Sequence, residues 1–148
     1  MDINNFTAGT TIASADVNEN FSDIAGAIND GWTPADQSWA YASANTITVP
    51  SGATAIYSVG DKIKITQTTV KYFYVTAVAD TTLTVTGGTD YTVANAAITS
   101  PYYSKAASPV GFPGWFNYAG SPTGFASLAT DSGRFLIVGR TVIVNYVI

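Results

Sequence analysis

Apolar and polar side chains alternate with a period of two through much of the chain between residues 46 and 86, which is the spacing of a β-strand with one buried face. The alternation is clear over 46–49, 62–66 and 82–86, and residues 70–78 are rich in aromatic and β-branched types. The pattern therefore predicts a mainly β fold.

Turn-forming residues separate these runs: Pro50-Ser51-Gly52, Val59-Gly60-Asp61, Gln67-Thr68-Thr69, Ala79-Asp80 and Gly87-Gly88-Thr89-Asp90. Short strands joined by tight turns are typical of a small antiparallel barrel or sandwich. We expect a small β-barrel over residues 32–103, because closure removes exposed sheet edges. Within it, residues 62–65 and 72–75 should form a hairpin.

Ahead of the barrel, residues 14–31 predict an amphipathic helix that follows an extended arm, residues 1–13. Ser14 is expected to cap the first turn, and Gly31 to end the helix in a left-handed conformation. The apolar residues of the helix are spaced by four, three and four positions, as in the a/d seam of a coiled coil. They are Val17, Phe21, Ile24 and Ile28.

Two interpretations of this seam stay open. The helix packs on its own domain, or it lies at a symmetry axis and packs against copies of itself. One of them must hold, because so short a helix is marginal in isolation.

Residues 100–124 are rich in proline, glycine and aromatic residues. Since proline lacks a backbone donor, we expect no central strand there and assign 104–132 as an ordered connector. Residues 133–148 predict a β-hairpin with Gly139-Arg140 at its turn. Two lone strands are marginal, so the hairpin should join another sheet or a partner chain, or begin a C-terminal β domain.

Composition narrows the function. Apolar residues make up 47% of the chain and charged residues 11%, so Thr, Ser, Asn and Gly must cover much of the surface. The net charge of −4 argues against nucleic-acid binding, which needs basic side chains to displace counterions. No apolar run approaches the roughly 18 residues of a membrane span, and the N-terminus lacks the features of a signal peptide. We expect synthesis in a cytoplasm.

The residue types of most catalytic sites are missing. The chain has no His and no Cys, which excludes Ser–His triads and the usual zinc sites. Two of its carboxylates could serve a glycosidase, but the acids fall in predicted turns or on the polar side of the helix. We therefore expect no enzyme activity, no cofactor and no metal, and a depolymerase fragment is the least favoured interpretation.

Several aromatic residues could stack on a sugar, namely Trp32, Trp39, Trp115, Phe116 and Tyr118. Trp and Tyr are also common in cores and subunit interfaces, where a large apolar area and a polar group are both useful. We favour the core or interface role, because polar partners for sugar hydroxyls are not clustered nearby.

Several stretches together resemble the bacteriophage tail-fibre and head-fibre minor structural proteins. In residues 8–21 a Gly-Thr arm leads into a helix with an Asp-Val-Asn-x-Asn-Phe core. The similarity continues through residues 31–35, 39–44, 62–73 and 88–98. In this family such modules precede a C-terminal β-sandwich, and residues 133–148 look like its first strands.

The resemblance implies a virion subunit, a homotrimer attached to other virion proteins through the arm. Its motifs are structural and carry no chemistry. The expected function is therefore that of a phage fibre, tail or capsid appendage subunit with the seam at the trimer axis. The alternative is a module that binds a host-surface glycan.

Overall fold

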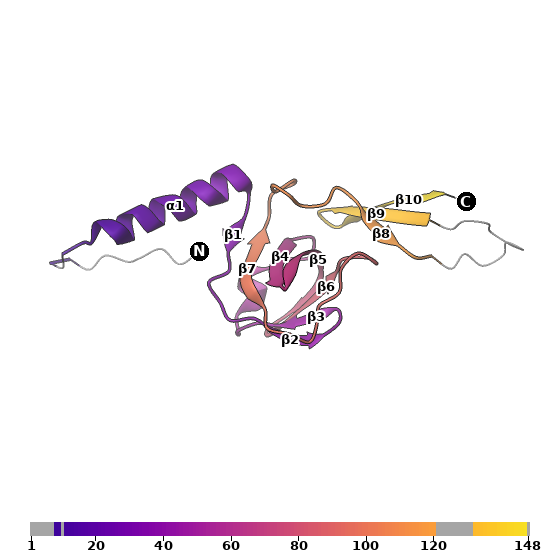
Figure 1. The fold of residues 1–148 in the computed structure, drawn as a ribbon, viewed down its shortest axis with the longest axis horizontal. Coiled ribbons are helices and arrows are strands. Elements are labelled where there is room, and N and C mark those ends of the chain that lie inside the picture. The colour runs from indigo at the N-terminus through magenta and orange to yellow at the C-terminus, as the bar shows by residue number, and fades with distance from the viewer. Residues whose placement is uncertain (1–7, 10, 121–131, 148) are drawn as a thin grey trace, which may run out of the picture.

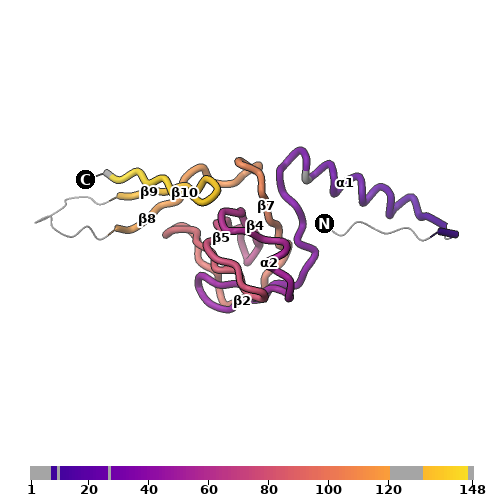
Figure 2. Tube along the Cα trace, turned by 180° about the vertical axis from the view of Figure 1, so that it is seen from behind, coloured from indigo at the N-terminus to yellow at the C-terminus, as the bar shows by residue number. Residues whose placement is uncertain are grey.

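A computed structural model describes residues 8, 9, 11–120 and 132–147. It confirms a mainly β fold with one N-terminal helix, α1, which spans Ser14–Asp30. A seven-stranded antiparallel sheet forms the body, and a three-stranded antiparallel sheet lies beside it. In Figure 1 the helix and the smaller sheet extend to opposite sides of the body, and Figure 2 shows the same arrangement from behind.

The larger sheet has the strand order β1-β7-β4-β5-β6-β3-β2. Its strands are β1 (Thr33–Pro34), β2 (Ala40–Ser43), β3 (Thr46–Thr48), β4 (Lys62–Gln67), β5 (Thr69–Ala79), β6 (Thr82–Thr86) and β7 (Thr99–Ser104). A single-turn helix, α2 (Ala53–Ile56), follows β3. The smaller sheet has the order β10-β9-β8, with β8 (Phe116–Tyr118), β9 (Ser132–Val138) and β10 (Thr141–Val147).

The predicted hairpin of β4 and β5 is confirmed, with Lys62 opposite Tyr74. Thr68 forms its turn in the left-handed region, with φ of 64°. Ile63 and Ile65 point into the core and are fully buried. Their burial explains the register, because a slip by one residue would place both isoleucines on the solvent side.

Two clusters of buried apolar residues hold the fold together. The larger lies inside the seven-stranded sheet and includes Ile47, Phe73, Val75, Leu83 and Val85. The smaller is mostly aromatic and lies where the two sheets meet: Tyr74, Phe116 and Ile137, with Tyr72, Tyr91, Phe112 and Phe135 packed around them. The three-stranded sheet is thus joined to the body by aromatic side chains.

The seven-stranded sheet does not close into the expected barrel. β1 and β2 form its two edges and do not pair with each other. β1 is only two residues long and contains Pro34, which lacks the N–H needed to continue a ladder. β1 is therefore too short to pair with β2 and close the sheet into a barrel.

The expectation that residues 100–124 contain no central strand is wrong for β7. This strand lies between β1 and β4 although it contains Pro101. The register between β4 and β7 shifts between the pairs Lys64–Tyr102 and Thr66–Thr99. Pro101 falls within this irregularity, so its missing N–H interrupts no regular ladder bond. Ser100, with φ of 45°, absorbs the bend.

The boundaries of α1 differ from expectation at one end. Ser14 is the first helical residue and not the cap, and Ala13 occupies the cap position without a side-chain hydrogen bond. Gly31 ends the helix at φ of 71°, as expected. The predicted arm falls largely on residues 1–7 and 10, outside the described part of the chain. No helix in the described ranges is long and apolar enough to span a membrane.

The predicted C-terminal hairpin is present as β9 and β10, with Thr141 opposite Val138 across the turn. It is not a lone pair of strands, because β8 extends it on one side. β8 lies in the stretch assigned as connector, and residues 121–131 of that stretch are outside the described residues.

Tyr57 has an unusual ionisation that can be measured. Its hydroxyl donates to Oε1 of Gln37 at 2.9 Å, and burial, with a smaller contribution from Tyr103, raises its pKa to about 12. The folded state holds this proton more tightly than the unfolded state, with its pKa near 10. We expect the stability contributed by Tyr57 to be complete below pH 10 and lost as the pH rises through 12. The difference in tyrosinate absorbance between wild type and Tyr57→Phe should titrate near pH 12, and a difference near pH 10 would contradict the assignment.

Candidate functional site

The apolar stripe of α1 is the first candidate for a functional surface. Phe21 is 68% exposed, Ile28 is 75% exposed and Ile24 is 36% exposed. Val17 is half-buried. The described part of the chain thus leaves the stripe largely open to solvent.

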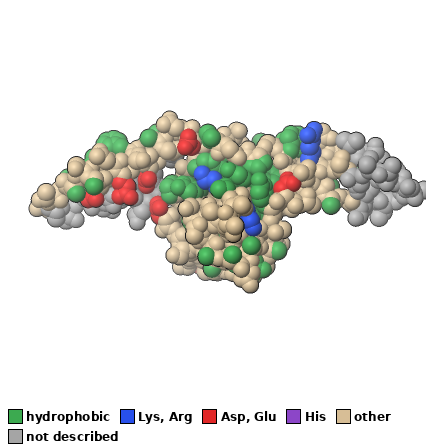
Figure 3. All heavy atoms as spheres, viewed as in Figure 1, with side chains coloured by type: hydrophobic (Ala, Val, Ile, Leu, Met, Phe, Trp, Pro, Cys, Tyr) green, Lys and Arg blue, Asp and Glu red, His purple; other side chains and the backbone are tan. Residues whose placement is uncertain are grey.

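The opposite side of α1 faces the protein itself. Ser22, Asp23, Gly26 and Asp30 line a cleft of about 240 Å³ whose other wall includes Lys64 and Tyr102. At 100° per residue, these helical positions lie roughly opposite the stripe. In Figure 3 acidic side chains gather mainly along the lower edge of the helix at the left of the view. In the C-terminal half of the helix, polar residues therefore border the body, whereas the apolar stripe faces away from it.

This orientation is fixed by contacts at the C-terminal end of α1. The Val110 N–H donates to the Asp30 carbonyl at 2.8 Å, and the Trp32 Nε1–H donates to the Val110 carbonyl at 2.8 Å. A side chain at Gly31 would meet Pro109 and Ala106 at 3.2 Å, so the segment after β7 lies directly against the helix end. Trp32 and Val110 are 78 positions apart in the sequence, so this contact could not be predicted from local sequence.

Lys64 adds a further contact beside the cleft. Its Nζ lies 4.7 Å from the centre of the Trp32 ring and 4.2 Å from that of Tyr102. Burial lowers the pKa of Lys64, and the carboxylate of Asp30 acts in the opposite direction. The lysine therefore links the β4–β7 region to the helix end by cation–π and electrostatic attraction.

Charges are absent from the flanks of the stripe. With Phe21 and Ile28 as a positions and Val17 and Ile24 as d positions, the neighbouring e and g positions include Asn18, Asn20 and Ala25. The acidic residues Asp16, Glu19, Asp23 and Asp30 occupy the c and f positions, away from the seam. Identical helices could therefore meet along the stripe without placing like charges side by side.

The β9–β10 hairpin is a second exposed apolar element. Val138, Val142, Ile143 and Val144 are between 45% and 59% exposed. Sequence analysis predicted that the hairpin would join another sheet or a partner chain, but it did not single out these four residues. The signal was available, because Leu136–Val138 and Val142–Val144 are continuous apolar runs, which are typical of strands covered on both faces.

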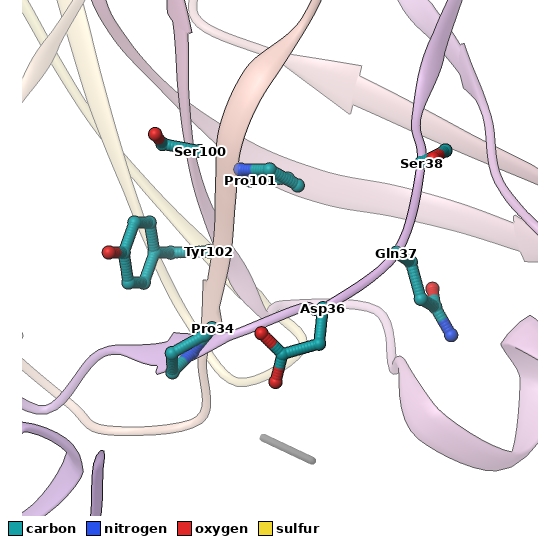
Figure 4. A pocket seen from close by; sticks show the side chains of 7 residues that line it. All are labelled: Pro34, Asp36, Gln37, Ser38, Ser100, Pro101 and Tyr102. Carbon is teal, nitrogen blue, oxygen red and sulfur yellow. The ribbon is translucent and has the colours of Figure 1, made fainter. Parts of the chain in front are cut away.

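A shallow cleft of about 400 Å³ lies between β7 and the segment that follows β1. Asp36 and Ser100 border it in left-handed conformations, with φ of 50° and 45°. Figure 4 shows that Ser100 and Tyr102 project to one side of β7 while Gln37 and Ser38 point away on the other. Gln37 is also occupied, since its Oε1 accepts from Tyr57. The polar groups of this cleft therefore do not converge on a ligand.

The aromatic residues selected from the sequence do not form one site. Trp32, Trp39 and Phe116 are buried in the core and offer no face to a sugar. Trp115 is half-buried with the Arg134 guanidinium 5.2 Å from its ring centre. Tyr118 is 44% exposed.

No family model matches this chain, and neither a curated protein nor a solved structure does.

The buried polar groups hold loops in place. Gln67 donates to the carbonyls of Ala94 and Ala96 and accepts from the Ala94 N–H, at 2.9–3.0 Å. Lys62 donates to the Ala106 carbonyl at 2.9 Å. Asp61 accepts from the Ser58 N–H, and burial raises its pKa. Among the described side chains, no group of three or more acidic residues could hold a metal ion.

Proposed function

We propose that this chain is a structural subunit of a bacteriophage fibre or of another tail or capsid appendage. Three copies would associate through the stripe of α1 and become part of the virion. The observation that carries the proposal is the exposure of the stripe: in the described part of the chain, Phe21, Ile24 and Ile28 point away from the body and stay open to solvent. Such a surface is unfavourable in water unless another molecule buries it.

Identical copies are the partners that fit this stripe best. The a/d spacing matches that of self-associating helices, and the neutral flanks permit them to approach. The resemblance of residues 8–21 to phage fibre proteins supports the same assembly. By that resemblance, the arm would attach the trimer to other virion proteins.

A glycan-binding role has weaker support. Three of the aromatic side chains that could stack on a sugar are buried, and the polar side chains of the shallow cleft diverge. The function that we propose is therefore assembly, without an enzymatic step, a cofactor or a metal.

The combined substitution Val17→Asn and Ile24→Asn tests the proposal. Light scattering of the wild-type chain should give three times the 15.5-kDa protomer mass, and the variant should give the protomer mass at micromolar concentration. The expected cause is the burial of two amide groups per helix at the seam without partners. Strand content, measured by circular dichroism, should be unchanged.

The matched control is Ala15→Asn with Ser22→Asn. It places the same two amides seven residues apart on the opposite side of α1, where both residues are exposed. This variant should remain trimeric. A wild-type monomer, or a seam variant with undiminished mass, would contradict the proposal.

A further inference from the structure

The two sheets of this protein differ in the residue types on their exposed faces. In the seven-stranded sheet, strand β6 follows the usual rule, with Leu83 and Val85 buried and threonines between them. In the β9–β10 hairpin, valine and isoleucine occupy the exposed positions. The hairpin is therefore an exception within this chain, and composition alone does not account for it.

The strand register places apolar residues on both faces of the hairpin. Val142 lies opposite Ile137 and Val144 opposite Phe135, so these four residues share one face. Ile143 lies opposite Leu136 and shares the other face with it. The body covers Ile137 but leaves Val142 and Val144 more than half exposed. A strand with this pattern is expected to be covered on both sides.

The two edges of the small sheet also differ. At the β8 edge, the Asn117 N–H donates to the Asp90 carboxylate at 2.7 Å and its carbonyl accepts from the Thr89 N–H at 2.8 Å. At the other edge, β10 pairs only with β9 in the described part of the chain. β10 has no Lys, Pro or acidic residue, the usual means of blocking an exposed edge.

We infer that the β9–β10 hairpin is a second self-association surface, which packs against the same hairpin of the other copies around the axis of the α1 helices. The inference rests on the proposed trimer. Figures 1 and 2 show α1 and the small sheet along one side of the long axis, with the body on the other side. The strands run roughly along that axis. One axis on that side can therefore bring both apolar elements together while the bodies remain outside.

Another copy fits better than a different protein because β10 offers no charge for specific recognition. Every side chain from Thr141 to Val147 is uncharged. The charged residues of the hairpin, Arg134 in β9 and Arg140 at the turn, lie outside β10, so copies that meet along β10 avoid like-charge repulsion. β10 and the flanks of the helix stripe share this absence of charge.

The full chain with Val142→Thr and Val144→Thr tests the inference. Threonine keeps the branched shape and strand preference of valine but removes apolar surface from the contact. We expect the apparent dissociation constant of the trimer, measured by sedimentation equilibrium, to rise at least about tenfold, which corresponds to about 1.4 kcal/mol. The matched control is Val59→Thr with Val70→Thr, the same change at exposed valines outside the hairpin, which should leave the constant unchanged.

Hydrogen exchange provides a measurement that does not depend on the hairpin variant folding. Amides of residues 141–147 should exchange faster in the Val17→Asn, Ile24→Asn monomer than in the wild-type trimer. Equal exchange in the two, or a hairpin variant that associates as tightly as its control, would overturn the inference. If the inference fails in this way but the Val17→Asn, Ile24→Asn variant still dissociates, the proposed function stands. A monomeric wild type would overturn both the inference and the proposed function.

Discussion

Replacing Phe116 with alanine is expected to lower the free energy of unfolding by about 3–5 kcal/mol, the usual loss for a fully buried aromatic residue. Phe116 is completely buried, and its ring lies 5.3 Å from Tyr74, 5.5 Å from Phe112 and 5.8 Å from Phe135 between ring centres. These partners belong to both sheets and to the segment between them. The truncation therefore removes the centre of the aromatic cluster that joins the sheets.

Urea denaturation followed by tryptophan fluorescence measures this loss. Protomer concentration must be held constant, because association adds to apparent stability. Phe116→Leu is the graded control: it retains most of the apolar volume and should lose clearly less than alanine. A loss below about 1 kcal/mol for Phe116→Ala would show that the cluster does not join the sheets energetically.

Gly60→Ala is expected to have the second large effect, because it would displace the β9–β10 turn from the body. Gly60 has φ of 94°, and a Cβ there would collide with the carbonyl oxygen of Gly139. Since the obstacle is backbone, a side-chain rotation cannot relieve it. We expect a loss of about 1–3 kcal/mol from this overlap, the usual penalty for overpacking.

Gly52→Ala separates that overlap from the cost of the left-handed conformation. Gly52 has φ of 90°, close to that of Gly60, but a Cβ there meets nothing within 4 Å. Its loss should be limited to about 1–2 kcal/mol, the cost of the left-handed region for alanine. Equal losses at the two positions in thermal or urea unfolding would mean that the contact with Gly139 contributes nothing.

Gly88, which follows β6, provides an independent test of such backbone contacts, because it lies against β8 of the three-stranded sheet. Its φ is 61°, and a Cβ would collide with the Asn117 carbonyl oxygen. Gly88→Ala should therefore resemble Gly60→Ala rather than Gly52→Ala.

The strands could be predicted from the sequence because each buries one face. Ile63 and Ile65 fix the face of β4, and the turn at Thr68 fixes its partner, so local pattern determines local structure. Sheet closure depends instead on the lengths of the two edge strands. The edge strand β1 has only two residues, which is too short to show an alternating pattern in the sequence. Pro101 was misjudged for a related reason: its effect depends on a register shift between β4 and β7 that only the assembled sheet contains.

The candidate surfaces were predictable to different degrees. The spacing of Val17, Phe21, Ile24 and Ile28 shows that α1 has an apolar stripe. It does not show which way the stripe faces, because that depends on the contact of Asp30 with Val110. The sequence favoured a core or interface role for Trp32, Trp39 and Phe116, but it could not decide between the two, because their segments carry no clear periodicity.

The seating of the β9–β10 turn on Gly60 has a consequence for how this protein can vary. Backbone atoms of Gly139 make the contact, so the side chains along the two strands are not part of it. The sequence of the hairpin can therefore diversify, by natural drift or by design, while the turn keeps its place. A hairpin with different exposed side chains could therefore replace this one and keep its place on the body, provided that it retains a glycine at the turn and the buried contacts of Phe135 and Ile137, although the proposed association through Val142 and Val144 would then change.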